Sequence, residues 1–393
     1  MNRLHMLIMI LVMIILSGCA IGNLETGIAD NTNRYYPVLD ENWSEIDPGQ
    51  LGWDIDALEE VFEFAQKHHS SGLVILFNGR IVARRQWSLD NPEVFAGVGY
   101  QDVWFHGTSP DGWAKEDVAS TQKSIIAVLA GIAQDRGLLK LDDPVSQYLG
   151  VGWSQASAEQ EAAVSIRHLL SMSSGLSEKL DYVFDAGSDW AYINKAYSLV
   201  NEVIQAASGL APNVFTREWL TEPMGMTQTE WITRSEFFRQ WNMNGLVTTA
   251  PDLARFGLMI QAGGEWANRR IVSKTYLDQA LSASTPHNPS YGYLWWVNSP
   301  EGFRGVRGSP DIVPGRRIPD APADWVSAAG TSDRRSSIVP SLGLVVARTG
   351  SPWKLKDDGT PLAVFEFDQQ LWKLLAAALP ENLDKRVGRN SRR

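Results

Sequence analysis

The sequence predicts an α/β fold of the α+β kind: one antiparallel sheet, built from both ends of the chain and flanked by helices, with a helical domain inserted between its parts. Clear β-type runs occur only near the start and the end of the chain, whereas the long middle region carries helical and loop signals. The 393 residues are 44% hydrophobic and 20% charged, so the chain can bury a large core.

The first half of the sheet domain shows three local signals. Asp54 precedes apolar residues at helical spacing, which predicts a helix over 55–67. Two β-rich runs, 73–77 and 81–83, flank Asn78-Gly79, a dipeptide suited to a type I′ turn, so we expect a hairpin. The apolar run 121–135 then predicts a buried helix that ends before Gly137.

The rest of the chain divides at about residue 284. Helical patterns occupy the middle region, at 166–170, 196–207 and 251–261. Strand signals return only late, at 325–329, 336–339 and 344–349, before a closing amphipathic helix at 362–379. We therefore predict a discontinuous sheet domain of residues 51–135 and 285–380, a helical domain of residues 136–284, and a polar tail of residues 381–393.

The N-terminus has the form of a secretory signal. Residues 1–18 carry Arg3, an apolar run too short for a confident membrane span, and small residues at the end. Leu16-Ser17-Gly18-Cys19 resembles the lipobox of bacterial lipoproteins, which implies acylation of Cys19, the only cysteine. The alternative is a buried cysteine behind a conventionally cleaved signal.

The resemblance implies a protein held in the bacterial cell envelope by a lipid on Cys19, with the membrane as its partner. The residues after Cys19 do not resemble the signal for inner-membrane retention, so we expect the periplasmic face of the outer membrane. Residues 19–50 are rich in Asn, Asp, Gly and Pro without a regular period, which predicts a tether.

Charge and histidine spacing exclude other classes of protein. The chain has 45 Asp and Glu against 35 Lys and Arg, a net charge of −10, which argues against nucleic-acid binding. Its six histidines show no metal-ligand spacing with supporting carboxylates, so we expect no metal and no cofactor. His106 and His168 fit local hydrogen bonding better than catalysis.

Ser120 and Lys123 form the first candidate catalytic pair. Residues three apart on a helix share a face, so the amine can reach the hydroxyl. A lysine can remove the proton of a serine if burial depresses its pKa. The alternative is a capping serine and a surface lysine. Ser351 and Lys354 repeat the spacing, but in a polar loop where no shared face is expected.

Tyr192-x-Asn194 is the only Tyr-x-Asn in the chain. A phenol near an ammonium can have its pKa lowered enough to shuttle a proton, and an asparagine can hold the lysine and a substrate carbonyl. The alternative is an ordinary helix entry. Tyr197 and Tyr182 are the nearest substitutes for the phenol.

The order of these motifs, followed by a late strand with a small-x-Gly sequence, resembles the serine β-lactamase and penicillin-binding protein superfamily, and within it the class C β-lactamase-related hydrolases and esterases. The resemblance covers roughly residues 55–378 and implies a β-lactamase/transpeptidase-like fold. Connecting segments also match, at 137–149, 166–175, 223–226 and 245–255.

The third motif departs from the lactamase form. Relatives carry Lys-Thr-Gly or His-x-Gly on the strand, and this chain has Ala328-Ala329-Gly330 followed by Thr331. The resemblance implies that Ala328 and Gly330 contact substrate, together with Asn194, and that the N–H groups of Ser120 and Thr331 form the oxyanion hole.

The cation that would recognise a substrate carboxylate is absent from this motif. Arg334, or Arg316 and Arg317, could replace it. We favour the alternative, that these arginines are solvated surface charges.

We therefore predict a secreted, lipid-anchored serine hydrolase that cleaves an ester or amide through an acyl-enzyme on Ser120, with Lys123 and Tyr192 moving the proton. The expected partner is a small-molecule ester, amide or cell-wall-derived substrate. The alternatives are a true β-lactamase or D-Ala-D-Ala carboxypeptidase, and a catalytically silent cell-wall-binding lipoprotein.

Overall fold

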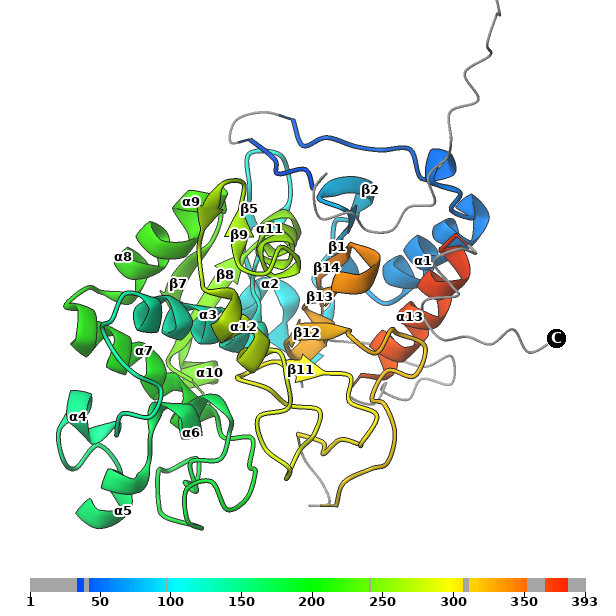
Figure 1. Cartoon of the computed structure of the whole chain (residues 1–393). Helices are drawn as coiled ribbons and strands as arrows, with labels where there is room; N and C mark the ends of the chain where they lie inside the picture. Colours follow the sequence, from blue (N-terminus) through cyan, green and yellow to red (C-terminus); the bar gives the residue numbers. More distant parts are fainter. Residues whose placement is uncertain are drawn as a thin grey trace, which may run out of the picture.

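The main sheet joins the two ends of the chain, as predicted (Figure 1). The computed structural model describes residues 34–38, 42–95, 98–239, 242–306, 311–351 and 365–380. The predicted signal segment, Cys19 and the tail lie outside these ranges. The sheet is antiparallel with strand order β11-β12-β13-β14-β1-β2. The strands are β1 (Ser70–Phe77), β2 (Arg80–Gln86), β11 (Trp296–Val297), β12 (Val326–Ala329), β13 (Arg335–Val339) and β14 (Leu344–Gly350).

The hairpin of β1 and β2 turns at Asn78 and Gly79, as predicted. Both have positive φ, 46° and 84°, as a type I′ turn requires. The described end of the predicted tether, from residue 42, lies against β2, where the N–H of Ile46 donates to the carbonyl of Ile81 at 2.9 Å. A turn of 3₁₀ helix (Pro48–Leu51) then leads into the first helix.

Helices cover both faces of the main sheet. α1 (Ile55–Lys67), capped by Asp54 as predicted, packs with α13 (Glu366–Ala378) on one face. α11 (Ala250–Gln261) packs on β1, β13 and β14. Neighbouring residues of β13 point to opposite faces, since Arg335 reaches Asp368 of α13 and Ser336 reaches the carbonyl of Leu253 of α11. A helix from the middle region therefore completes the core of the sheet.

The expectation that strand signals return only after residue 284 is wrong. A second antiparallel sheet has the order β5-β6-β8-β7, with β5 (Phe105–Thr108), β6 (Ala114–Asp117), β7 (Glu230–Thr233) and β8 (Asn244–Thr248). Two short pairs are β3 (Glu93–Phe95) with β4 (Val98–Gly99), and β9 (Glu265–Trp266) with β10 (Arg269–Arg270). These strands are too short for a clear period, and β6 pairs with a segment more than a hundred residues away.

The helical part surrounds α3 (Gln122–Asp135), which is almost wholly buried, as predicted. α3 packs on α7 (Asn194–Ser208) and α12 (Lys274–Ala280), and it reaches β12 of the main sheet. Gly131 allows the contact with α12, because a Cβ there would lie 2.4 Å from the ring of Tyr276. The remaining helices are α2 (Tyr100–Val103), α4 (Ser146–Leu149), α5 (Ala158–Ala163), α6 (Ile166–Leu170), α8 (Pro212–Thr216), α9 (Glu222–Met224) and α10 (Glu236–Arg239).

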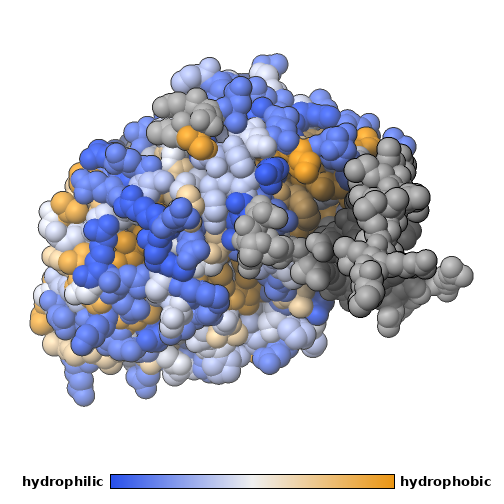
Figure 2. All heavy atoms as spheres, turned by 45° about the horizontal axis from the view of Figure 1, so that its top comes forward, coloured by the Kyte–Doolittle hydropathy of each residue, from blue (hydrophilic) through white to orange (hydrophobic). Residues whose placement is uncertain are grey.

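The molecular surface is largely hydrophilic on the face shown in Figure 2, with small separate apolar areas. Exposed large apolar side chains include Val151, Val183 and Met243, which come from different segments. Within the ranges the structure describes, no helix is long and apolar enough to cross a membrane.

Candidate active site

Ser120 lies in a tight turn directly before α3. The turn is a single 3₁₀ segment (Ala119–Thr121), and Ala119 has a positive φ of 50°, which is unfavourable for a residue with a side chain. The carboxylate of Asp117 stabilises this conformation by accepting the Ala119 N–H at 2.9 Å. Ser120 remains partly exposed at the turn, where a substrate can reach its hydroxyl.

Lys123 lies one helical turn further, with Nζ 2.7 Å from Ser120 Oγ, as the spacing predicted. The lysine is only 2% exposed. Burial lowers its pKa well below the usual value, and the nearby positive charge of Arg234 lowers it further, while Glu178 opposes the shift. Arg234 itself is held by two hydrogen bonds to Asp117, at 2.6 and 2.8 Å. The amine can therefore lose its proton far more readily than an exposed lysine.

Asn194 holds the other side of the amine. Its Oδ1 accepts from Lys123 Nζ at 2.9 Å, and its Nδ2 donates to Glu178 Oε1 at 3.0 Å. Glu178 also accepts the backbone N–H groups of Asn194 and Lys195 at the start of α7. Because a carboxylate accepts only, it fixes the amide with its oxygen toward Lys123. Sequence reasoning missed Glu178, which stands sixteen residues before Asn194.

Tyr192 joins the pair, as predicted, but with the opposite shift in its pKa. Its ring centroid lies 4.5 Å from Lys123 Nζ, and its hydroxyl is hydrogen-bonded to Ser120. Burial raises the pKa of Tyr192, and the bond to Ser120 offsets only part of that shift. The expected lowering required a charged ammonium, whereas burial disfavours the charged forms of both Lys123 and Tyr192.

Tyr197, which the sequence predicts only as a substitute for Tyr192, also lies beside Lys123. The ring of Tyr197 lies 4.2 Å from Lys123 Nζ, and its hydroxyl accepts from Gln122 and Asn242 at 2.9 and 2.7 Å. The hydroxyl of Tyr197 is therefore bonded to two side-chain amides, whereas the hydroxyl of Tyr192 is bonded to Ser120. Tyr182, the other substitute, is exposed and donates to Asp185.

The end of β12 lies on the other side of Ser120 from the helices that carry Lys123 and Asn194, and forms a second wall of the site. A Cβ on Gly330 would lie 2.3 Å from the carbonyl oxygen of Val118 and 2.9 Å from the backbone nitrogen of Thr121, so only glycine allows the strand to press against the turn of Ser120. Thr121 Oγ1 also donates to the carbonyl of Arg334 at 2.8 Å. Ala328 is completely buried, and Thr331 follows at the exposed edge.

The expectation that the nearby arginines are solvated surface charges is wrong for two of them. Arg334 is 0% exposed and bound to Glu116 Oε2 at 2.8 Å. Arg317 is buried among the rings of Trp296, Phe303 and Phe365, at 4.3–4.6 Å from their centroids. Arg316 is half-buried. A substrate carboxylate could reach Arg334 or Arg317 only by displacing these partners.

Other candidates lie outside this cluster. Ser351 is buried after β14, and Lys354 falls outside the described residues. His168 Nδ1 bonds to Ser165, and burial lowers the pKa of His106. Across the described segments, no group of three His, Cys, Asp or Glu side chains could hold a metal ion.

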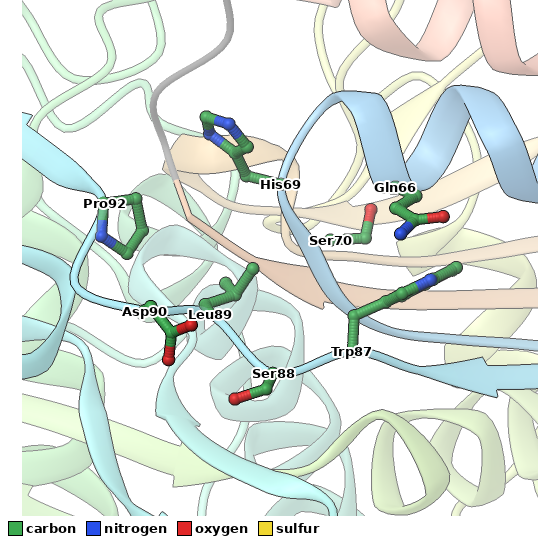
Figure 3. Close-up of a pocket in the computed structure, with 8 residues that line it drawn as sticks. All are labelled: Gln66, His69, Ser70, Trp87, Ser88, Leu89, Asp90 and Pro92. Atoms are coloured by element: carbon green, nitrogen blue, oxygen red, sulfur yellow. The ribbon is translucent and has the colours of Figure 1, made fainter.

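A separate pocket of about 400 Å³ lies at the start of β1 and after β2, with His69, Trp87 and Asp90 around it (Figure 3). The predicted site residues do not line it. Its lining residues are Gln66, His69, Ser70, Trp87, Ser88, Leu89, Asp90 and Pro92.

The assembled groups can support nucleophilic attack. A hydroxyl that touches an amine of lowered pKa can transfer its proton as it attacks an electrophilic carbon. A neutral phenol on the same hydroxyl can return a proton to a leaving group. Ser120, Lys123, Tyr192 and Asn194 therefore meet as the sequence predicted.

Comparisons with known proteins agree with this fold. The candidate β-lactamase of Bacteroides dorei superposes with a TM-score of 0.61 at 18% identity, covering 86% of this chain and 100% of that one. The candidate 6-aminohexanoate-dimer hydrolase of Bacillus anthracis gives 0.58 at 14% identity, covering 90% of each chain. EstCE1, a hydrolase with promiscuous acyltransferase activity, gives 0.56 at 14% identity, covering 84% of this chain and 99% of that one. At these identities the likeness shows the fold.

Sequence comparison identifies the family. An uncharacterized protein of Alkalihalophilus pseudofirmus is 24% identical over 254 residues, which is 58% of this chain and 70% of that protein. The model of the family described as Beta-lactamase matches residues 56–354, a range that contains the whole cluster around Ser120. The chain therefore belongs to the Beta-lactamase family.

Proposed function

We propose that this hydrolase of the β-lactamase type cleaves an ester or amide through an acyl-enzyme on Ser120. The observation that carries the proposal is the contact of Lys123 Nζ with Ser120 Oγ at 2.7 Å, on an amine whose pKa burial lowers. A lysine whose pKa is lowered in this way reaches its neutral, proton-accepting form more readily than an exposed lysine. Among the described residues, the partly exposed serine is its only hydrogen-bond partner besides Asn194.

The reaction then has two stages. Ser120 Oγ bonds to the substrate carbonyl carbon while its proton moves to Lys123, and the N–H groups of Ser120 and Thr331 hold the resulting oxyanion. The bond to the leaving group breaks as Tyr192, reprotonated by Lys123, supplies that group with a proton. Water repeats the sequence on the acyl-enzyme, releasing the acid and restoring the serine.

We further propose that neutral esters are better substrates than β-lactams. Ala328 stands where β-lactamases of the superfamily carry a cation, and Arg334 is paired with Glu116. A carboxylate without a charge-assisted partner loses roughly 1.5–3 kcal/mol of binding, or about 10–150-fold.

The test measures kcat/KM for a p-nitrophenyl ester and a chromogenic cephalosporin, together with fluorophosphonate labelling of Ser120. We expect labelling of the wild type, with the ester turned over faster than the cephalosporin. Faster cephalosporin turnover would show a true β-lactamase, and release of D-Ala from a D-Ala-D-Ala peptide would show a carboxypeptidase. A folded protein that is neither labelled nor active would show the silent binding lipoprotein.

We also propose that lipid on Cys19 anchors the enzyme in the bacterial envelope, on the periplasmic face of the outer membrane. The support is the sequence Leu16-Ser17-Gly18-Cys19. Each buried CH₂ of a lipid chain contributes about 0.8 kcal/mol, so two or more chains hold a protein stably. The wild type should fractionate with outer membranes, and Cys19→Ala should be unprocessed or released. A mature N-terminus elsewhere, found by mass spectrometry, would refute the anchor.

A further inference from the structure

Three successive carbonyl groups after β12 are each held by a different arginine. Gly330 O accepts from Nη1 of Arg335, Thr331 O accepts from Nη1 of Arg334 at 3.3 Å, and Ser332 O accepts from Nη1 of Arg348. The three arginines are buried and come from the end of the loop and from β13 and β14.

This arrangement directs the N–H groups of the loop. In a trans peptide the carbonyl and the N–H of the next residue point in opposite directions. The carbonyl of Gly330 faces Arg335, so the N–H of Thr331 faces away from that guanidinium. Gly330 meanwhile presses on the turn of Ser120. The arginines and the serine turn therefore clamp the first peptide of the loop from both sides.

The loop needs such support because its backbone is strained. Ser332 and Asp333 have φ of 70° and 51°, in the left-handed region that favours glycine and is unfavourable for residues with side chains. Carbonyl acceptors on buried guanidinium groups can offset this cost, since hydrogen bonds to charged groups are stronger than neutral ones.

Carboxylates pair with two of the arginines. Glu116 binds Arg334 and accepts the N–H of Gly350. Arg335 pairs with two carboxylates, those of Asp333 and of Asp368 on α13. Arg348 donates in addition to Ser70 Oγ and the carbonyl of His68. Each arginine thus binds one carbonyl of the loop and is itself held by partners outside those three carbonyls.

We propose that Arg334, Arg335 and Arg348 are positioning residues for the oxyanion hole, which fix the peptide of Thr331 through the carbonyls of the loop. The inference rests on the proposed function and deepens it. The three guanidinium groups touch no reacting atom. They orient backbone N–H groups, and their positive charge polarises the same peptides toward a developing oxyanion.

The test replaces each arginine by lysine, which keeps the charge but cannot donate to the carbonyl and to the second partner in the same geometry. The readouts are kcat and KM for the p-nitrophenyl ester, and the affinity for an aryl boronic acid, whose tetrahedral adduct with Ser120 places an oxygen in the hole. We expect Arg335→Lys and Arg348→Lys to lower kcat and boronate affinity in parallel, each about 10–100-fold, with KM within a few-fold.

Arg255→Lys is the matched control. This half-buried arginine also donates to backbone carbonyls, those of Met224 at 3.1 Å and Pro37 at 3.4 Å, but neither carbonyl belongs to the loop after β12. It should lower the melting temperature and leave boronate affinity unchanged. Asp368→Asn loosens Arg335 from α13 without touching the loop carbonyls. Asp368→Asn should lower kcat and boronate affinity less than Arg335→Lys does. It replaces Arg335→Lys as the test if that variant fails to fold.

Folded arginine variants with wild-type kcat and boronate affinity would overturn the inference, as would an equal loss in the Arg255 variant. An unlabelled wild type would instead show that the proposed function is wrong. Wild-type labelling at Ser120 with unaffected arginine variants would leave the function standing and reject only the positioning role.

Discussion

The two walls of the site are built from opposite kinds of chemistry. On the helical wall, Lys123 lies between the rings of Tyr192 and Tyr197 and bonds to neutral partners, Ser120 and Asn194. On the strand wall, buried guanidinium groups hold backbone carbonyls and pair with carboxylates.

The difference follows from what each wall supplies. Proton transfer needs groups that are poised between two forms, and burial among rings moves the pKa of Lys123 toward neutrality. Oxyanion support needs a fixed positive potential, and carboxylates hold two of the three guanidinium groups of this wall in place. Variants that remove the nucleophile, the base or the groups around the base test the role of the helical wall.

The largest effect is expected at the nucleophile. Ser120→Ala and Lys123→Ala should each remove nearly all turnover without unfolding the protein, because nucleophile and base act as a unit. Ser351→Ala is the control, since Ser351 belongs to the other Ser-x-x-Lys spacing, and it should leave kcat nearly unchanged. Ester hydrolysis by Ser120→Ala within a few-fold of the wild type would contradict the mechanism.

Tyr192→Phe should lower kcat by about 10²-fold or more, because it removes only the hydroxyl bonded to Ser120 and keeps the ring over Lys123. Tyr197→Phe is the matched control, since its ring also lies over the lysine while its hydroxyl bonds Gln122 and Asn242. Steady-state kinetics with melting temperatures separate catalysis from packing. A larger loss of kcat in Tyr197→Phe would assign the proton shuttle to that residue.

Glu178→Gln should shift the pH profile with a smaller loss of rate. Activity requires the neutral form of Lys123, so it rises with pH through the pKa of the lysine. The negative charge of Glu178 raises that pKa, so its removal should lower the pKa and move the acid limb of kcat/KM to lower pH.

The control for this shift is Glu202→Gln, which removes a carboxylate from α7, the helix whose first N–H groups donate to Glu178. Its profile should stay in place. An acid limb of Glu178→Gln that moves to higher pH would show that Lys123 does not control the rise of activity.

The sequence alone determined the features that depend on neighbours along the chain. Asp54 before an apolar period gave α1, Asn78-Gly79 gave the hairpin, and the three-residue spacing placed Lys123 beside Ser120. These features follow from backbone periodicity, which local sequence controls.

Only the tertiary structure decided the electrostatic state of the site and the support of its strand wall. The pKa of Lys123 depends on burial and on Arg234 and Glu178, which lie 111 and 55 residues further along the chain. Burial likewise reversed the predicted shift of Tyr192, and pairing with Glu116 converted Arg334 from an expected surface charge into a core residue. Desolvation and charge pairing act through space, so spacing along the sequence cannot reveal them.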